Sequence, residues 1–208
     1  MSERTTGARA ALSMAGVYQR LQDVLGSRRF QRRLITEHVA PVTGTRMLDL
    51  GCGTGALIEH VPREVAYHGF DPSERYIAAA RQRWGDRGTF WCAGVGDPLP
   101  HGAGTFARAT AIGVLHHLDD ATAAQLAARA AHAQTADGAL VTYDPAITPA
   151  TSRLARFVIE RDRGMHVRRP DDYAALLAPR FAEVTVVAVA GHLRIPYTGC
   201  IITARRPR

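Results

Sequence analysis

The residues best suited to chemistry lie in the stretch LDLGCGTG at 48–55, where an acid stands just before three alternating glycines. Glycine has no Cβ, so Gly51, Gly53 and Gly55 allow the chain to turn sharply and a ligand to approach the main chain. Asp49 adds a carboxylate that can face cationic or hydroxyl groups. The pattern predicts a nucleotide-type ligand held by the backbone of a turn that follows a buried strand.

A second acid, Asp71, ends the apolar segment VAYHGFD about one β-α unit later. Ser73 is a good helix N-cap, and Tyr76, Ile77 and Ala80 then fall on one face of the expected helix. We therefore expect Asp71 at the end of the strand next to the first one. A carboxylate placed there can accept both hydroxyls of a ribose.

These motifs resemble the class I methyltransferases that use S-adenosylmethionine (SAM), whose first motif is an acid followed by GxGxG at a strand end. The run AIGVLHHLDD at 111–120 resembles the ending of their fourth strand, and the last two apolar runs resemble their closing hairpin. The resemblance implies SAM as cofactor, S-adenosylhomocysteine (SAH) as product, and a Rossmann-like, doubly wound, seven-stranded and mostly parallel sheet.

The main competing interpretation is a dinucleotide site, because GCGTGA also satisfies the G-x-G-x-x-[GA] fingerprint with an acid about twenty residues further on. Asp49 opposes it, since dinucleotide sites usually keep an apolar strand residue there. The glycine pattern alone is compatible with both cofactors; the strand-4 ending and the hairpin favour SAM.

The resemblance also assigns cofactor contacts. The methionine part would lie on the first turn, the ribose on Asp71 and the residue after it, and the sulfonium side on the segment after strand 4. The adenine acid expected after strand 3 is missing: either Asp97 shifts to the base, or the backbone of Gly94 and Val95 reads it, and Trp91 is a core residue or a stacking one. The expected cofactor set is Asp49, Gly51, Cys52, Gly53, Gly55, Asp71, Pro72, Gly94, Val95, Ile112 and Leu115.

Two adjacent histidines, His116 and His117, follow the fourth strand at the edge where open α/β sheets bind ligands. If the acceptor is a hydroxyl, a base must remove its proton, and histidine suits neutral pH. Asp144, at the end of the fifth strand, could orient that histidine or contact substrate. The alternative is that one histidine packs beneath the cofactor and the other caps the next helix.

The acceptor pocket is expected in the segment RDRGMHVRRPDDY at 161–173, together with an aromatic from the N-terminal helices and another from the hairpin. Arginine forms bidentate contacts with carboxylates and phosphates. Each of these residues could instead form a structural ion pair or an exposed face, which is the more common role for such a residue. The candidates are Tyr18, Arg161, Arg163, His166 and Tyr197.

The intervening elements alternate between strands and helices, which implies right-handed crossovers and a parallel sheet. Helices are expected at 11–25, 27–39, 54–60, 73–84, 120–135, 152–162 and 170–178, and strands at 46–50, 65–70, 89–93, 107–112 and 139–144, with a β-hairpin over 181–204. We expect a single domain over 1–208, with residues 1–45 as a helical extension or lid and 46–208 as the core.

Composition constrains the remaining function classes. Three cysteines without paired spacing indicate neither disulfides nor a zinc site, and the sequence has no secretory signal or long apolar run, so a cytoplasmic protein without membrane insertion is expected. All 26 basic side chains are arginine. Net charge is +5 over 1–46, −4 over 47–150 and +6 over 151–208. Basic flanks fit a solvated surface, an anionic small substrate or nucleic acid, but no aromatics interleave them for base stacking.

The sequence therefore predicts a SAM-dependent methyltransferase acting on oxygen, or less favourably nitrogen, of a small polar or anionic metabolite. A non-catalytic SAM-binding partner subunit and an RNA methyltransferase are the alternatives. Neither the acceptor nor the oligomeric state follows from the sequence.

Overall fold

The structure is a computed structural model that describes residues 27–99, 102–160, 165–191 and 196–208. Its strands are β1 (Arg46–Leu50), β2 (Ala66–Asp71), β3 (Gly88–Cys92), β4 (Phe106–Ile112), β5 (Gln134–Pro145), β6 (Phe181–Ala190) and β7 (Thr198–Pro207). Its helices are α2 (Ser27–Arg33), α3 (Glu74–Trp84), α4 (Asp120–Ala133), α5 (Arg153–Glu160) and α6 (Pro170–Leu177), with short helical turns η1 (Leu34–Val39), η2 (Ala56–His60) and η3 (Leu115–His117).

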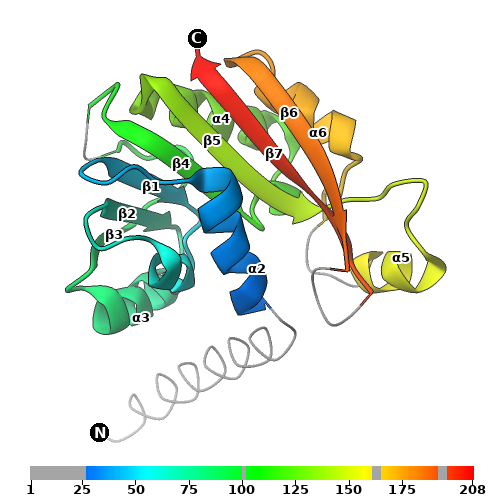
Figure 1. The fold of residues 1–208 in the computed structure, drawn as a ribbon, viewed down its shortest axis with the longest axis horizontal. Coiled ribbons are helices and arrows are strands. Elements are labelled where there is room, and N and C mark those ends of the chain that lie inside the picture. Colours follow the sequence, from blue (N-terminus) through cyan, green and yellow to red (C-terminus); the bar gives the residue numbers. More distant parts are fainter. Residues whose placement is uncertain (1–26, 100–101, 161–164, 192–195) are drawn as a thin grey trace, which may run out of the picture.

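The strands form one seven-stranded sheet in the order β3-β2-β1-β4-β5-β7-β6 (Figure 1). Strands β1 to β5 pair in parallel, whereas β7 runs antiparallel to both β5 and β6. The predicted mostly parallel sheet with a C-terminal antiparallel hairpin is confirmed. The carboxyl ends of β1, β2, β4 and β5 consequently share one edge, which carries Asp49, Asp71, the two histidines and Asp144.

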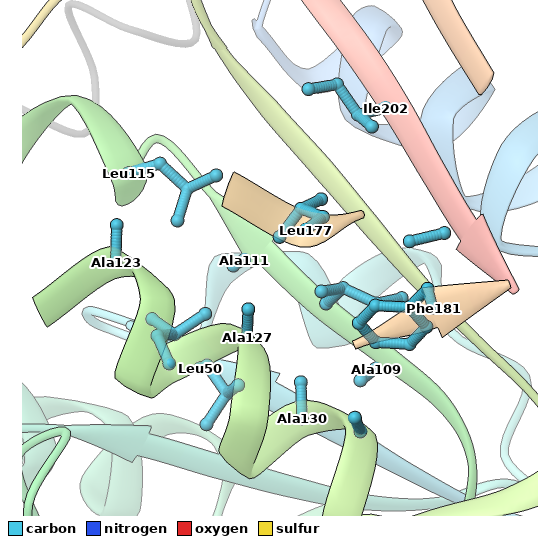
Figure 2. Close-up of a cluster of buried hydrophobic side chains, with 14 of the residues drawn as sticks. Leu50, Ala109, Ala111, Leu115, Ala123, Ala127, Ala130, Leu177, Phe181 and Ile202 are labelled. Atoms are coloured by element: carbon cyan, nitrogen blue, oxygen red, sulfur yellow. The ribbon is translucent and has the colours of Figure 1, made fainter. Parts of the chain in front are cut away.

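Alternate strand residues feed two separate cores, as the period-two geometry of strands requires. On one face, Leu48 and Leu50 of β1 pack with α4 and α6, where small alanines let α4 approach the sheet closely (Figure 2). On the other face, Met47 of β1 packs with η1, η2 and α3. The strands are therefore held on both sides, and the turns at their carboxyl ends start from a fixed frame.

The predicted helix over 27–39 is only partly correct. The α-helical part ends at Arg33, and 34–39 continues as a wider π-helical turn that buries Leu34, Ile35 and Val39. Ala40 ends it in a left-handed conformation, with φ 43°, and donates its N–H to the carbonyl of Ile35. The wider turn brings three apolar side chains onto the sheet, which an unbroken amphipathic pattern does not reveal.

The other elements lie near their predicted positions, with two informative differences. Ser73 caps α3 as expected, accepting the N–H of Tyr76. The helix predicted over 54–60 is a single 3-10 turn that begins only at Ala56, because Gly55 is still in a left-handed conformation. Strand β5 begins at Gln134, five residues before the predicted start, because α4 passes directly into it.

Among the described helices, none has the length and apolar character needed to cross a membrane. The expected helix at 11–25 lies outside the described residues.

Candidate active site at the carboxyl edge of the sheet

The glycine turn after β1 has the conformation that its sequence predicts. Gly51, Gly53 and Gly55 all have positive φ, at 77°, 54° and 74°. A Cβ on Gly51 would lie 2.5 Å from Cγ2 of Val114, and one on Gly55 would lie 2.8 Å from Cε1 of Phe90. A Cβ on Gly53 would meet nothing within 4 Å. The outer glycines are therefore needed for packing, and Gly53 presents bare backbone to open space.

Asp71 connects this turn to the end of β2. Its Oδ2 accepts the backbone N–H of Gly53 at 3.0 Å, and its Oδ1 accepts that of Ser73 at 2.9 Å. Burial raises the pKa of Asp71, while both N–H donors oppose that rise. The carboxylate thus fixes Gly53 at the place where the ribose acid was expected. The adjacent Pro72 is exposed, and Cys52 is a partly buried thiol whose Sγ lies where a Cβ on Gly69 would clash.

Asp49 points below the turn, into the sheet side covered by η1 and α3. Its carboxylate accepts the phenol O–H of Tyr67, and its Oδ1 accepts the hydroxyl of Thr110 at 2.7 Å. Only 2% of the residue is exposed. Burial raises the pKa of Asp49 to about 6, even though the two hydroxyl donors lower it. Both oxygens are thus engaged from below.

The segment after β3 is folded upon itself. Asp97 Oδ2 accepts the N–H of Gly94 at 2.7 Å, and the carbonyls of Gly94 and Val95 accept hydrogen bonds from Arg129 on α4. The ring of Trp91 stacks on His68 and Phe70, at centroid distances of 5.4 and 4.9 Å. Trp91 is therefore partly buried and packs against the core. Asp97 is hydrogen-bonded to Gly94, which was its alternative for adenine recognition.

The segment after β4 turns at Gly113, which has φ 69° and donates its N–H to the carbonyl of Tyr143. Ile112 is partly buried on the η1 side. Leu115 is fully buried against α4, so its side chain belongs to the core (Figure 2).

His116 pairs with Asp144 at the adjacent ends of β4 and β5. Its Nδ1 lies 2.8 Å from Asp144 Oδ1, and its backbone N–H donates to the same oxygen at 3.1 Å. Both residues are buried, at 5% and 1% exposure. His117 is exposed, and its ring lies 4.0 Å from that of His116 between centroids. Asp144 was expected either to orient a histidine or to contact the substrate, and the structure shows that it contacts His116.

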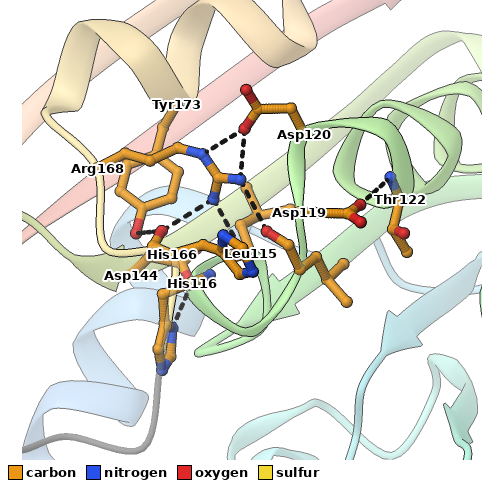
Figure 3. A network of polar contacts seen from close by, with 10 residues as sticks. Leu115, His116, Asp119, Asp120, Thr122, Asp144, His166, Arg168 and Tyr173 are labelled. Atoms are coloured by element: carbon orange, nitrogen blue, oxygen red, sulfur yellow. Dashed lines mark hydrogen bonds and ion pairs between the residues drawn. The ribbon is translucent and has the colours of Figure 1, made fainter.

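Arg168 holds the histidine segment in place (Figure 3). Its guanidinium donates to the carbonyls of Leu115, Leu118 and His166, and twice to Asp120 Oδ1. These five hydrogen bonds use all five N–H donors of an arginine. The backbone N–H of His166 also donates to the His116 carbonyl at 2.9 Å. The segment before α6 and the turn carrying His116 are thus joined as one unit.

The expected acceptor residues are only partly placed. Tyr18, Arg161 and Arg163 lie outside the described residues. His166 is half-buried beside the histidine turn. Tyr197 is half-buried next to Thr198, whose hydroxyl donates to the carbonyl of Ala146 at 2.9 Å. The carboxyl end of β5 therefore lies between His166 and Tyr197.

Sequence reasoning missed three residues that the structure brings into the site: Arg168, Tyr67 and Thr110. Arg168 stands among similar arginines, and nothing in its neighbours distinguishes it. Tyr67 and Thr110 lie within strands at core positions, and only the pairing register places them on Asp49. Among the described residues, no three histidine, cysteine or acidic side chains gather in a way that could hold a metal ion.

Comparison with known proteins gives a family match over part of the chain and a shared fold. Residues 47–138 match the methyltransferase domain family. No curated protein matches the sequence.

Two solved structures illustrate the fold. A geranyl diphosphate C-methyltransferase from Streptomyces coelicolor, in complex with Mg²⁺, geranyl-S-thiolodiphosphate and SAH, has 15% identity and a TM-score of 0.68, covering 86% of this chain and 76% of its own. A phosphoethanolamine N-methyltransferase 2 from Haemonchus contortus, in complex with phosphomonomethylethanolamine and SAH, has 16% identity and a TM-score of 0.68 over 86% of this chain. This chain spans about half of that protein, 52%.

A third similar structure is the [4+2]-cyclase SpnF, with 17% identity, a TM-score of 0.67, and coverage of 85% of this chain and 80% of its own. At these identities the likeness concerns the fold. Residues 47–138 therefore match a methyltransferase domain, and the sheet order and the glycine turn agree with that match.

Proposed function

We propose that this protein transfers the methyl group of SAM to an oxygen of a small, polar or anionic metabolite. The observation that carries the proposal is the arrangement of Gly53 above Asp71. Gly53 offers bare backbone to open space, and the carboxylate that fixes it lies where a ribose would be bound. A ligand that needs both a close main-chain approach and a hydroxyl acceptor fits this arrangement.

In the donor half of the site, the turn holds the methionine part of SAM and Asp71 takes the ribose hydroxyls. Gly94 and Val95 take the adenine side, and the segment from Ile112 lies beside the sulfonium. Methyl transfer is an in-line displacement, so the main task of these contacts is to align donor, methyl and acceptor.

In the acceptor half, His116 is the proposed general base. Asp144 accepts from its Nδ1, which places the ring proton there and leaves Nε2 as the basic nitrogen. A base so oriented can remove a hydroxyl proton as the oxygen attacks the methyl group. This pairing supports transfer to oxygen, since an amine acceptor with a free lone pair needs no such base.

Charge supports an anionic acceptor. Arg153, Arg156 and Arg169 are exposed in the part of the chain between β5 and α6, and residues 151–208 carry eleven arginines against five acids. The two methyltransferases of similar fold act on, or are complexed with, phosphorylated molecules. Arginine side chains provide the bidentate donors that phosphates and carboxylates require.

A second candidate is a SAM-binding protein that does not transfer methyl groups. The similar fold of a [4+2]-cyclase and the absence of an adenine acid favour it. The two candidate functions differ most clearly in turnover. Either one predicts that the protein binds SAH, but only a methyltransferase would transfer the methyl group of SAM to an acceptor.

The test combines a paired substitution with a turnover assay. Gly53→Ala adds a Cβ in open space at φ 54°, and Gly44→Ala does the same at φ 79° in the turn before β1. Both variants incur the same kind of left-handed strain, so their stabilities should fall alike. Calorimetry with SAH should show at least a tenfold loss of affinity for Gly53→Ala and none for Gly44→Ala.

The turnover assay follows the transfer of labelled methyl from SAM to a panel of small phosphorylated and carboxylated alcohols. Transfer to one of them supports the proposal. The assay is repeated with amines and with a water-soluble extract of small metabolites. If the protein binds SAH but transfers methyl to none of these acceptors, the non-catalytic candidate is favoured. Equal SAH affinity for both glycine variants would refute the placement of the cofactor.

A further inference from the structure

The buried acid Asp49 is engaged by hydroxyl groups from the two strands that flank it. Register places Asp49 on β1 opposite Gly69 of β2 and Thr110 of β4. Tyr67, two residues before Gly69, reaches it from the same sheet face, and its phenol O–H donates to Oδ2. Thr110 donates to Oδ1 at 2.7 Å. Among the described residues, no arginine or histidine is one of the groups that shift the pKa of this acid.

A carboxylate in such a place is difficult to keep ionised. Burial favours the neutral form of a carboxyl group, whereas hydrogen bonds donated to its oxygens favour the charged form. The other titratable groups facing it work against ionisation: Asp71 at the end of β2 repels the charge, and the Cys52 thiol in the turn stays protonated because burial and the two acids raise its pKa. In the part of the chain that the structure describes, the two hydroxyl donors are therefore the groups that favour the charged form of Asp49.

We propose that Tyr67, assisted by Thr110, is a positioning residue that keeps Asp49 ionised beneath the glycine turn, so that the turn receives a cationic cofactor. The inference rests on the proposed function, because SAM carries an ammonium and a sulfonium on the part that would lie on this turn. A negative charge under the turn attracts both groups, and a protonated Asp49 attracts neither. Tyr67 acts through Asp49 and need not touch the cofactor.

The experiment measures the affinity for SAH by calorimetry from pH 5 to pH 8.5. The proteins are the wild type, Tyr67→Phe, Thr110→Val and the control Tyr173→Phe. The control also removes a buried phenol, one that donates to the carbonyl of Pro145 instead of to Asp49. Circular dichroism confirms that each variant is folded across this range.

The wild type should lose affinity as the pH falls through about 6, where Asp49 takes up its proton. Loss of one hydroxyl donor raises the pKa of Asp49, so in Tyr67→Phe the loss of affinity should begin about one pH unit higher. At pH 7 its affinity should be about tenfold below that of the wild type, and at pH 8.5 the two should converge, since one pKa unit corresponds to a tenfold change. Thr110→Val should shift in the same direction.

A purely structural role would lower the affinity by the same factor at every pH. A pH-independent loss in Tyr67→Phe and Thr110→Val, or a shift as large in Tyr173→Phe, would overturn the inference and leave the proposed function intact. Titration of Asp71 cannot produce the expected shift in Tyr67→Phe, because Tyr67 donates to Asp49 and not to Asp71. Any effect of Asp71 on the affinity for SAH is the same in all four proteins. Absence of SAH binding by the wild type at every pH would overturn the proposed function, and this inference with it.

Discussion

His116 and Asp144 are joined twice through one oxygen: Asp144 Oδ1 accepts both the backbone N–H and the Nδ1–H of His116. The second oxygen, Oδ2, is buried and has no hydrogen-bond partner among the described residues. Burial raises the pKa of Asp144, and the two bonds from His116 oppose the rise. The double contact fixes both the tautomer and the backbone of the histidine, whereas His117 is exposed beside it.

This asymmetry predicts different outcomes for the two histidines. His116→Ala should lower kcat by about 10² to 10⁴, the range expected for loss of a general base, with SAH affinity changed less than threefold. His117→Ala should retain at least a tenth of the wild-type kcat. Single-turnover methyl transfer and SAH calorimetry on both variants measure the two quantities. A larger kcat loss in His117→Ala would transfer the role of base to His117.

Arg168 should prove essential for the placement of His116. Arg168→Lys keeps the charge, but a single ammonium cannot reach three carbonyls and Asp120 at once. We expect kcat to fall at least tenfold, with SAH affinity nearly unchanged, and the free energy of unfolding to fall by about 1–3 kcal/mol, because buried carbonyls lose their donors. The matched control is the neighbouring exposed Arg169, whose substitution by lysine should leave stability within about 0.5 kcal/mol. Wild-type kcat in Arg168→Lys would contradict the positioning role.

The alternation of strands and helices, the closing hairpin and the turn conformation could be predicted because their signals are local. The alternating glycines at 51–55 permit the positive φ that a sharp turn after a strand needs, and the strand ends at Asp71 and Asp144 follow from short apolar runs. Since the carboxyl ends of parallel strands lie at one edge, the expected approach of Asp144 to a histidine followed from the predicted parallel sheet.

What could not be predicted depends on side-chain direction across the sheet. The sequence indicated that the carboxylate of Asp49 can face a ligand, but it did not reveal that Tyr67 and Thr110 donate to both of its oxygens. Arg168 is one of four arginines within the basic run 161–169, and only its contacts with the carbonyls of Leu115 and Leu118 distinguish it. The π-helical turn at 34–39 likewise follows from packing on the sheet and not from its amphipathic period.

A buried amide gives a stability prediction remote from the site. Gln134, at the junction of α4 and β5, is 4% exposed, and neither its Nε2 nor its Oε1 has a hydrogen-bond partner among the described residues. Leaving a buried polar group unsatisfied costs about 1–3 kcal/mol. Gln134→Met, similar in shape, should therefore raise the free energy of unfolding by about 1 kcal/mol or more in urea titrations. Gln125→Met, on the exposed side of α4, is the control and should change it by less than about 0.5 kcal/mol.

The charge of Asp49 should lower the stability of the folded protein although it supports binding of the cofactor. Its pKa is about 6 in the folded protein against an ordinary 3.8, so between these values the folded state binds a proton that the unfolded state has lost. Stability contributed by this group is therefore highest at low pH and declines as the pH rises towards 6. Asp49→Asn removes the charge and with it the decline.

The free energy of unfolding of Asp49→Asn, relative to the wild type, should thus be about 2 kcal/mol more favourable at pH 7.5 than at pH 4.5, at 1.36 kcal/mol per pKa unit. Comparing the two pH values cancels the fixed cost of fitting an amide into the site. Urea unfolding of both proteins at each pH measures the difference, and SAH affinity should fall at least tenfold in the variant. A difference that does not change with pH would mean that the pKa of Asp49 in the folded protein stays near its ordinary value. A change clearly larger than about 2 kcal/mol would mean that Asp49 is still neutral in the folded protein at pH 7.5, and that no buried charge supports the glycine turn.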